Sequence, residues 1–216
     1  MSRIYDCSSA ENRSIGIKAA VNAVKSSRLV VLPTDTLYGL GADAFDNDAV
    51  ARLLKTKKRG SDMPVPVLVG SWDTARGLVH SYDARLRTLI EAFWPGALSI
   101  VVPQAPSLMW NLGDTRGTVM LRMPLHSVAI ELLRETGPMA VSSANISGQP
   151  PATTAAMAKE QLGTAVSAYL DGGECTEGVA SSIIDLSGAA PKLLREGGIS
   201  AEQIAEVLDI DVESLR

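Results

Sequence analysis

The amino-acid sequence predicts one α/β domain over residues 1–216, built on a twisted, mixed β-sheet that is flanked by helices. The first observation is that strand-like and helix-like segments alternate along the chain, which is typical of helices layered on a sheet. The second is that 46% of the 216 residues are hydrophobic but only 4% are aromatic, so the core must be aliphatic. The third is that some connections, such as 171–180, are too short for a crossover helix, which indicates antiparallel pairs within the sheet.

Eight short apolar runs predict the strands, because runs of Val, Ile and Leu bounded by Pro, Gly or polar residues are typical of buried strands. The first run, Leu29 to Leu32, stops at Pro33, which has no N–H for a sheet ladder. The third run follows Trp94-Pro95-Gly96, and Trp94 is expected to fill the core. In chain order we expect strands over 29–32, 65–69, 97–102, 118–122, 139–142, 168–170, 181–186 and 192–195.

Seven segments with apolar residues at helical spacing predict the helices, and most begin beside a residue that can cap a helix. The first helix is expected to turn Ile15 and Val24 toward the core. His126 opens the fifth helix, and this lone histidine, like His80, is expected to be a capping or surface residue. In chain order we expect helices over 11–27, 46–58, 71–79, 84–93, 127–135, 153–161 and 201–207.

Charge and cysteine content exclude several classes of protein. The formal net charge of −4 argues against a dedicated nucleic-acid binder, which usually carries excess positive charge to neutralise phosphates. Cys7 and Cys175 are too few for a disulfide framework or a structural zinc site. No basic segment is followed by an apolar signal-peptide core, and no apolar run is long enough to span a bilayer. We therefore expect a soluble cytoplasmic protein without a membrane segment.

A polar segment follows the first predicted strand. Its side chains that can hydrogen-bond are Thr34, Asp35, Thr36 and Tyr38, and two glycines, Gly39 and Gly41, come directly after them. Polar groups at the end of a buried strand, followed by glycines that let the backbone approach a ligand, are the usual make-up of a binding site. The same segment can equally be a polar turn that contains two glycines.

A basic cluster closes the second predicted helix. Lys55, Lys57, Lys58 and Arg59 place four positive charges within five residues of an otherwise acidic chain. Cations suit the C-terminal end of a helix dipole, so the cluster can be a solvated helix end. Because it precedes a predicted strand, it can also be a cradle for an anionic ligand.

Side chains with ligand-binding chemistry recur at the ends of predicted strands. They are Thr34, Thr118, Arg122, Ser143, Ser181 and Arg195. Strand ends converge on one crevice in open α/β sheets, so we expect these side chains to surround one site. Arg122 either forms an ion pair with a neighbouring acid or clamps a ligand carboxylate with its bidentate fork.

Seven motifs resemble the YrdC/Sua5 family of threonylcarbamoyl-AMP synthases, also called TsaC. They follow the family's order and are PTDTLYGLG at 33–41, KKR at 57–59 with Pro64, WPG at 94–96, LRMP at 121–124, SANISG at 143–148, SSIID at 181–185 and LLREGGI at 193–199. Any one motif is weak evidence, but together they cover nearly the whole catalytic domain. The chain resembles the short form of the family, without the C-terminal extension of Sua5.

The resemblance implies a fold and a reaction. The fold is a YrdC-like twisted, mixed α/β sheet with a large concave cavity. The reaction converts L-threonine, bicarbonate and ATP into L-threonylcarbamoyladenylate and pyrophosphate, and it depends on positioning and charge neutralisation. The product is expected to pass to the tRNA threonylcarbamoyl transferase machinery, which modifies adenosine 37 of tRNA. Mg²⁺ is the expected cofactor, held by the ATP phosphates rather than by protein side chains.

The resemblance also implies roles for individual residues. L-threonine is expected to bind Thr34, Arg122 and Ser181, with Arg122 on its carboxylate. Lys57 and Arg59 are expected to be the catalytic residues, acting on the phosphates. Contacts with ATP are expected from Lys55, Lys57, Arg59, Thr118, Ser143, Asn145 and Arg195, and a bicarbonate or carbamate pocket is expected at Thr36 and Tyr38.

Two positions depart from the family pattern, since Met63 stands where many relatives carry Asn and Leu68 where many carry His. Some relatives have been described as binding double-stranded RNA, so a second hypothesis is an RNA-binding module of the same fold, with at least a weak contact to tRNA or RNA. The net charge of −4 opposes this hypothesis and only the basic cluster supports it. A third hypothesis is an accessory domain of hydrogenase-maturation proteins, but the zinc-finger and acylphosphatase segments that usually accompany such a domain are missing.

Overall fold

A computed structural model describes residues 2–58, 60, 63–175 and 178–216 of the protein. In the described part of the chain, one ten-stranded sheet runs in the order β1-β8-β2-β3-β7-β4-β6-β5-β9-β10. Its strands are β1 (Arg3–Asp6), β2 (Leu29–Leu32), β3 (Gly39–Asp43), β4 (Val67–Leu68), β5 (Leu98–Pro103), β6 (Thr118–Arg122), β7 (Met139–Ser143), β8 (Val166–Asp171), β9 (Ser182–Asp185) and β10 (Lys192–Arg195). The sheet contains parallel pairs such as β4–β6 and antiparallel pairs such as β5–β6, so the prediction of a mixed sheet is confirmed. The 171–180 connection was wrongly taken to indicate an antiparallel pair, because it joins β8 to β9, which are not neighbours in the sheet.

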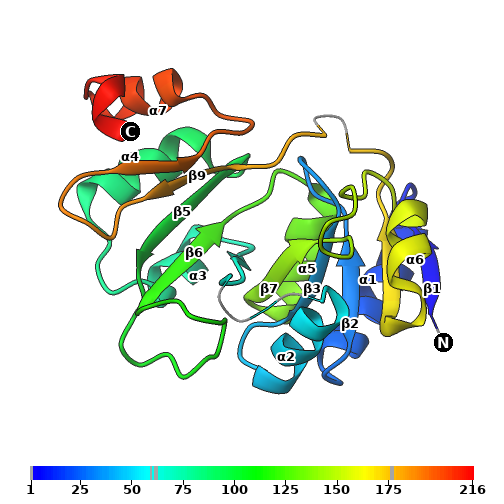
Figure 1. The fold of residues 1–216 in the computed structure, drawn as a ribbon. Helices are drawn as coiled ribbons and strands as arrows, with labels where there is room; N and C mark the ends of the chain where they lie inside the picture. Colours follow the sequence, from blue (N-terminus) through cyan, green and yellow to red (C-terminus); the bar gives the residue numbers. More distant parts are fainter. Residues whose placement is uncertain (1, 59, 61–62, 176–177) are drawn as a thin grey trace.

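The seven predicted helices are all present (Figure 1). They are α1 (Ala10–Val24), α2 (Asn47–Thr56), α3 (Trp72–Leu78), α4 (Ala84–Phe93), α5 (Ser127–Thr136), α6 (Ala155–Leu162) and α7 (Ala201–Leu208), with short 3-10 turns η1 (Gly163–Ala165) and η2 (Val212–Leu215). Ser9, Asp46 and Ser71 cap α1, α2 and α3 by accepting a backbone N–H with their side chains. None of these helices is both long enough and apolar enough to cross a membrane.

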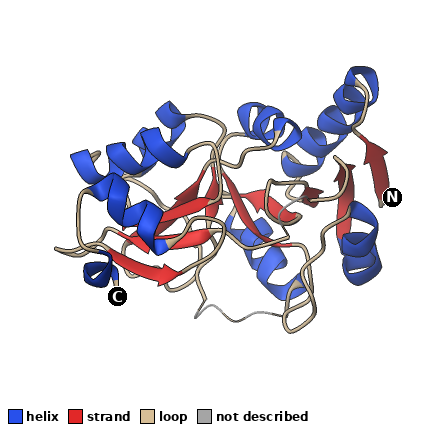
Figure 2. Cartoon of the chain, turned by 90° about the horizontal axis from the view of Figure 1, so that it is seen from above, coloured by secondary structure: helices blue, strands red, loops and turns tan. Residues whose placement is uncertain are grey.

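The sheet is covered on both faces, as Figure 2 shows for the helices on either side of the strands. Leu29 and Val31 of β2 belong to a core that includes residues of α2 and α6, whereas Val30 and Leu32 face a second core with residues of α1 and α5. A strand buried on both faces needs apolar residues at every position. This explains why β2 reads as an unbroken run of Leu and Val.

Two strands were not predicted, and one of them changes the interpretation of the glycines in the polar segment. Gly39 and Gly41 lie within β3, a central strand of the sheet, and not in a loop. A Cβ at Gly39 would come within 2.5 Å of Val141 Cγ1, and one at Gly41 within 2.7 Å of Met139 Cε. The glycines therefore make room for side chains of the neighbouring strand β7, and no backbone–ligand contact is needed to explain them.

The other missed strand, β1, lies at the sheet edge, and only its central residues are partly buried. The inward face predicted for α1 was partly wrong. Ile15 is 55% exposed, while Ile17 and Val24 are buried. The helix turns its small residues toward the sheet, where Gly16 lies close to Tyr5. Trp94 is buried as predicted, and its indole N–H donates to the Leu98 carbonyl at 2.7 Å.

Candidate active site

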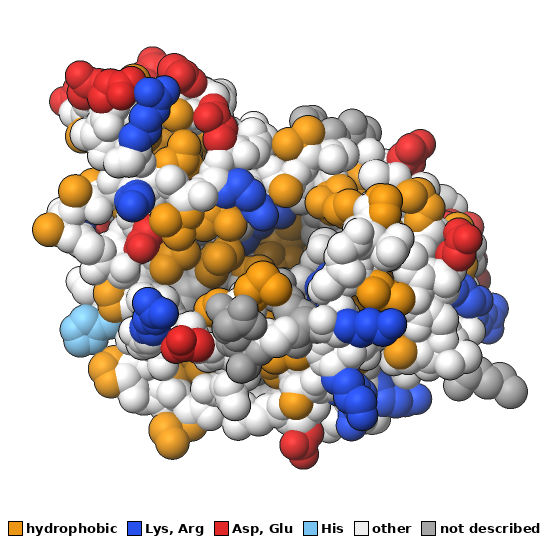
Figure 3. Space-filling view, in the orientation of Figure 1, with side chains coloured by type: hydrophobic (Ala, Val, Ile, Leu, Met, Phe, Trp, Pro, Cys, Tyr) orange, Lys and Arg blue, Asp and Glu red, His pale blue; other side chains and the backbone are white. Residues whose placement is uncertain are grey.

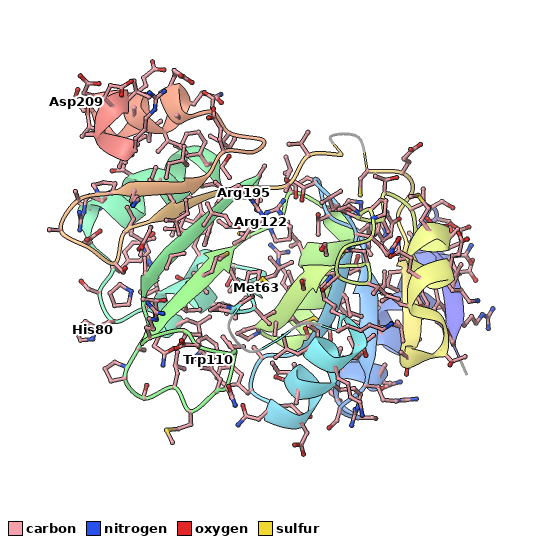
Figure 4. The ribbon with its side chains drawn as sticks, viewed as in Figure 1. Met63, His80, Trp110, Arg122, Arg195 and Asp209 are labelled. Carbon is pink, nitrogen blue, oxygen red and sulfur yellow. The ribbon has the colours of Figure 1, made fainter. Side chains whose placement is uncertain are left out.

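A cavity of about 290 Å³, called here the Arg122 cavity, opens near the middle of the sheet. Its polar lining residues are Thr34, Thr36, Tyr38, Ser99, Arg122, Ser142, Ser143, Ser181 and Arg195. Figure 3 shows a hollow at this place with blue side chains of Lys or Arg beside it, and Figure 4 shows Arg122 and Arg195 close together there. The structure thus brings five of the six strand-end residues to one site.

Arg122 is held from three directions at the end of β6. It is only 6% exposed. Its Nε donates to the Gly96 carbonyl at 2.9 Å, Nη1 donates to Thr36 Oγ1 at 2.8 Å, and Nη2 donates to Asp35 Oδ1 at 2.7 Å. A guanidinium has five N–H donors, so these three bonds leave two donors without a partner among the described residues. Burial lowers the pKa of the Arg122 guanidinium, whereas the nearby Asp35 carboxylate raises it. The guanidinium stays charged.

Thr34 organises the turn that carries Asp35 and Thr36. Its hydroxyl donates to the Leu37 carbonyl at 2.6 Å and accepts the backbone N–H groups of Thr36 and Leu37, each at 3.2 Å. Such hydroxyl-to-backbone bonds fix a turn locally. The turn presents Asp35 and Thr36 to the Arg122 guanidinium. Thr34 therefore lies on the cavity wall, with its hydroxyl already bonded inside the turn.

A second arginine reaches the cavity from β10. Arg195 donates from Nε and Nη2 to the Ser181 carbonyl, at 3.0 and 2.7 Å. The Ser181 hydroxyl lies 2.9 Å from that of Ser99 on β5. Burial lowers the pKa of Arg195, and the nearby charge of Arg122 lowers it further. Among the described residues, the two arginines face one paired carboxylate, that of Asp35, so this region carries a net positive charge, which suits anionic ligand groups.

Lys57 is buried beside the loop that follows β7. Its ammonium donates to the carbonyls of Ser143 and Asn145, at 2.6 and 2.8 Å, and to the Asn145 side-chain oxygen at 3.1 Å. Its own carbonyl accepts the Ser147 N–H at 3.0 Å. Ser143 lines the Arg122 cavity, whereas Lys57 and Asn145 do not. The contact of Lys57 with phosphates stays a prediction, and the structure shows that Lys57 holds the end of β7 at Ser143 and the loop that follows it.

Tyr38 is fully buried and ties two segments together. Its hydroxyl donates to the Gly173 carbonyl at 2.6 Å and accepts the Gly172 N–H at 3.1 Å. Burial raises the pKa of Tyr38 well above that of a free tyrosine. The hydroxyl is thus a neutral group that holds the 172–173 turn beside the polar segment.

Several predicted residues lie off the cavity wall. Lys55 is exposed on the last turn of α2, and the Thr118 hydroxyl donates to the Thr115 carbonyl at 2.7 Å, at the opposite end of β6 from Arg122. Arg59 lies outside the described residues. Of the two departures from the family pattern, Leu68 is buried on the cavity wall and Met63 is 45% exposed.

A second cavity of about 640 Å³, called here the His126 cavity, shares Thr34 with the Arg122 cavity. It is lined by Asp35, His126, Gly172 and Cys175, among others. The expectation that His126 is a capping or surface residue is confirmed for its position only: it occupies the cap position of α5 but does not cap the helix through its side chain, and its Nδ1 is buried without a described partner. The imidazole packs on Gly172, where a Cβ would come within 2.7 Å of Cε1, and burial lowers the pKa of His126.

The sequence pointed to neither Ser99 nor Asp35 as an individual site residue. Ser99 gave a detectable signal, since it is one polar residue within an apolar strand. Asp35 gave no such signal apart from its place in the polar segment, because its contribution to the site is an ion pair with Arg122, which is distant in the sequence. Among the described residues, no group of three or more His, Cys, Asp or Glu side chains could hold a metal ion.

This mixed sheet, with two arginines meeting in a cavity at strand ends, has the features of a protein that binds small anionic ligands. The family model Sua5/YciO/YrdC, described as "Telomere recombination", matches residues 22–197. The chain therefore belongs to the Sua5/YciO/YrdC family.

Individual relatives agree with this assignment. A Mycobacterium tuberculosis H37Rv protein, provisionally named a threonylcarbamoyl-AMP synthase, is 62% identical over 215 residues, which cover 100% of this chain and 99% of the relative. The threonylcarbamoyl-AMP synthase of Pyrococcus abyssi is 36% identical over 89% of this chain, and this match spans 57% of the relative's length. A crystal structure of P. abyssi Sua5 complexed with L-threonine matches with a TM-score of 0.88 and 34% identity, over 95% of this chain and 61% of the other.

Proposed function

We propose that this protein is a threonylcarbamoyl-AMP synthase, a nucleotidyltransferase that acts on L-threonine, bicarbonate and ATP. The observation that carries the proposal is the Arg122 guanidinium, which is 6% exposed and lines the cavity. Three of its five N–H donors are bonded within the protein, and two are available to a ligand. A fixed guanidinium suits a carboxylate, which every amino acid carries. The names of the relatives support the same activity.

The reaction forms two bonds in succession. The neutral amine of threonine attacks the carbon of bicarbonate, and loss of water leaves a carbamate. A carbamate oxygen then attacks the α-phosphorus of ATP, and pyrophosphate leaves with the electrons of the broken P–O bond. Neither step needs a covalent bond to the protein. The protein contributes by holding the reactants together and by offsetting their negative charge.

The cavity has the size and charge for the amino-acid end of this reaction. Its volume of about 290 Å³ is at the small end of ligand pockets, which run from roughly 300 to 1,000 Å³. Arg122 would hold the threonine carboxylate, with Thr34 and Ser181 beside it. Arg195 and Ser143 would contact the nucleotide, which extends toward the open side, and Thr36 and Tyr38 would border the carbamate.

The phosphates would meet Lys55 and Lys57 at the end of α2, and Arg59 of the same basic cluster would join them. Lys57 would act together with Ser143 at the end of β7 and with Asn145 in the following loop, whose carbonyls its ammonium already holds. Mg²⁺ would enter on the ATP phosphates. When bound there, Mg²⁺ would neutralise phosphate charge and favour departure of pyrophosphate. The product would pass to the threonylcarbamoyl transfer machinery that acts on tRNA.

The test is release of pyrophosphate from ATP by the purified protein with Mg²⁺. We expect release that requires both L-threonine and bicarbonate, so that omission of either returns the signal to background. The absence of release with all three substrates present, or release that does not depend on threonine, would contradict the proposal. Salt-sensitive binding of RNA without pyrophosphate release would favour the RNA-binding hypothesis instead.

A further inference from the structure

Asp35 is a charged residue to which neither the family resemblance nor the proposed function gives a role. Its side chain is 14% exposed and forms an ion pair with Arg122, whose side chain is 8% exposed. Asp35 lines the His126 cavity but not the Arg122 cavity, so it stands behind the guanidinium as seen from the proposed threonine site. It is therefore placed to act on Arg122 without touching a ligand in the Arg122 cavity.

The Asp35 carboxylate is itself anchored. Its Oδ1 accepts the Arg122 Nη2–H at 2.7 Å and the backbone N–H of Leu125 at 2.9 Å. Leu125 lies two residues before α5, so the position of the carboxylate is fixed by the start of a helix. The Thr34 turn fixes the backbone on the other side of Asp35. A carboxylate whose Oδ1 and backbone are both fixed in this way can impose an orientation on the group that it binds.

The guanidinium needs such an orienting partner. Arg122 is a planar fork on a long side chain, and a bidentate contact with a carboxylate requires the correct plane as well as the correct place. The Gly96 carbonyl fixes Nε and the Thr36 hydroxyl fixes Nη1, while Asp35 fixes Nη2. All three bonds are charge-assisted because the guanidinium donor is charged, and the bond to Asp35, at 2.7 Å, is the shortest of the three.

We propose that Asp35 is the positioning residue for the amino-acid carboxylate, because it sets the plane of Arg122 from behind the Arg122 cavity. This inference rests on the proposed function. It assigns Asp35 an effect on the amino-acid substrate alone, since its described contacts are with Arg122 and Leu125 and not with the residues expected to bind ATP.

The test compares three variants of the full chain by the KM for threonine and the KM for ATP in the pyrophosphate assay. Asp35→Ala removes the partner, and Asp35→Glu keeps the charge but moves the carboxylate by one methylene. Asp35→Asn keeps an oxygen acceptor at the same place and is the conservative rescue. We expect Asp35→Ala and Asp35→Glu to raise the threonine KM by about fivefold or more, with the ATP KM within twofold of wild type. Asp35→Asn is expected to bring the threonine KM back to within about threefold of wild type.

The control is Asp46→Ala, because Asp46 also accepts one backbone N–H, that of Ala49, at 2.9 Å, but it caps α2 away from the Arg122 cavity. Asp46→Ala is expected to lower the melting temperature while leaving both KM values unchanged. An unchanged threonine KM in Asp35→Glu would overturn the inference. So would a threonine KM in Asp35→Asn as high as in Asp35→Glu, or an equal rise in both KM values. If Asp35→Ala does not fold, the Glu and Asn variants decide. Failure of the proposed function is seen separately, as a wild-type protein without threonine-dependent pyrophosphate release.

Discussion

Replacing Arg122 by Ala tests the carboxylate clamp most directly. The substitution removes a charge-assisted bidentate contact with threonine, which contributes about 1.5–3 kcal/mol to binding. Because each 1.4 kcal/mol is a factor of ten, the threonine KM should rise by roughly 10- to 150-fold. The measurement is the threonine dependence of pyrophosphate release at saturating ATP. An unchanged threonine dependence in the folded variant would show that Arg122 is purely structural.

The same substitution also has a cost in stability that must be separated from binding. Asp35 is left almost buried without its partner, and breaking a buried pair in this way costs about 3–5 kcal/mol in the free energy of unfolding. The double variant Arg122→Ala/Asp35→Ala removes the unpaired carboxylate as well. We expect it to regain part of the lost melting temperature but none of the lost threonine affinity. Recovery of both properties together would mean that Arg122→Ala acted only by destabilising the fold.

Three further predictions concern other parts of the molecule. Lys57→Ala should lower turnover and ATP use, because it frees the loop that follows β7, and normal turnover would show that Lys57 has no part in the reaction. Burial lowers the pKa of His126 below the 6.5 of a free histidine, so the unfolded chain binds more protons and stability should fall as pH drops below about 6.5. The charge of Asp35 raises the pKa of His126 and the charge of Arg13 lowers it further. His126→Gln should therefore reduce the loss of melting temperature between pH 7.5 and 5. An equal loss in the variant and the wild type would refute this role of His126. Gly39→Ala should destabilise by about 1–3 kcal/mol, because its Cβ would come within 2.5 Å of Val141, whereas a Cβ at Gly77 meets nothing within 4 Å; equal melting temperatures of the two Gly→Ala variants would contradict this.

Periodicity and composition were sufficient for most of the fold. The seven helices and eight of the ten strands were predicted, because each has either a helical apolar period or a run of aliphatic residues. The strand β3 was missed because glycine has low β-propensity, and Gly39 and Gly41 are explained only by Val141 and Met139 of β7. That information is tertiary, and the local sequence does not contain it.

Local sequence features also predicted which residues meet at the site, but not how their side chains are bonded. Strand ends are local features, so the sequence alone was sufficient to place Thr34, Arg122, Ser181 and Arg195 together. The bonding of each side chain could not be predicted in this way. Whether Lys57 reaches a phosphate or a backbone carbonyl depends on where the loop after β7 lies, and this is set by contacts over more than eighty residues of sequence.

Arg122 can both form an ion pair and clamp a ligand, because a guanidinium has more N–H donors than its protein partners use. A carboxylate partner uses one of five guanidinium donors here, and two neutral acceptors use two more. The ion pair with Asp35 offsets the cost of burying the charge, since an unpaired buried guanidinium would be strongly destabilising. It also leaves the positive charge of Arg195 in excess beside the cavity, so a ligand carboxylate meets a net attractive field even though Arg122 is already paired. Buried pairing is thus what allows a cation to be fixed, charged and still available at the end of β6.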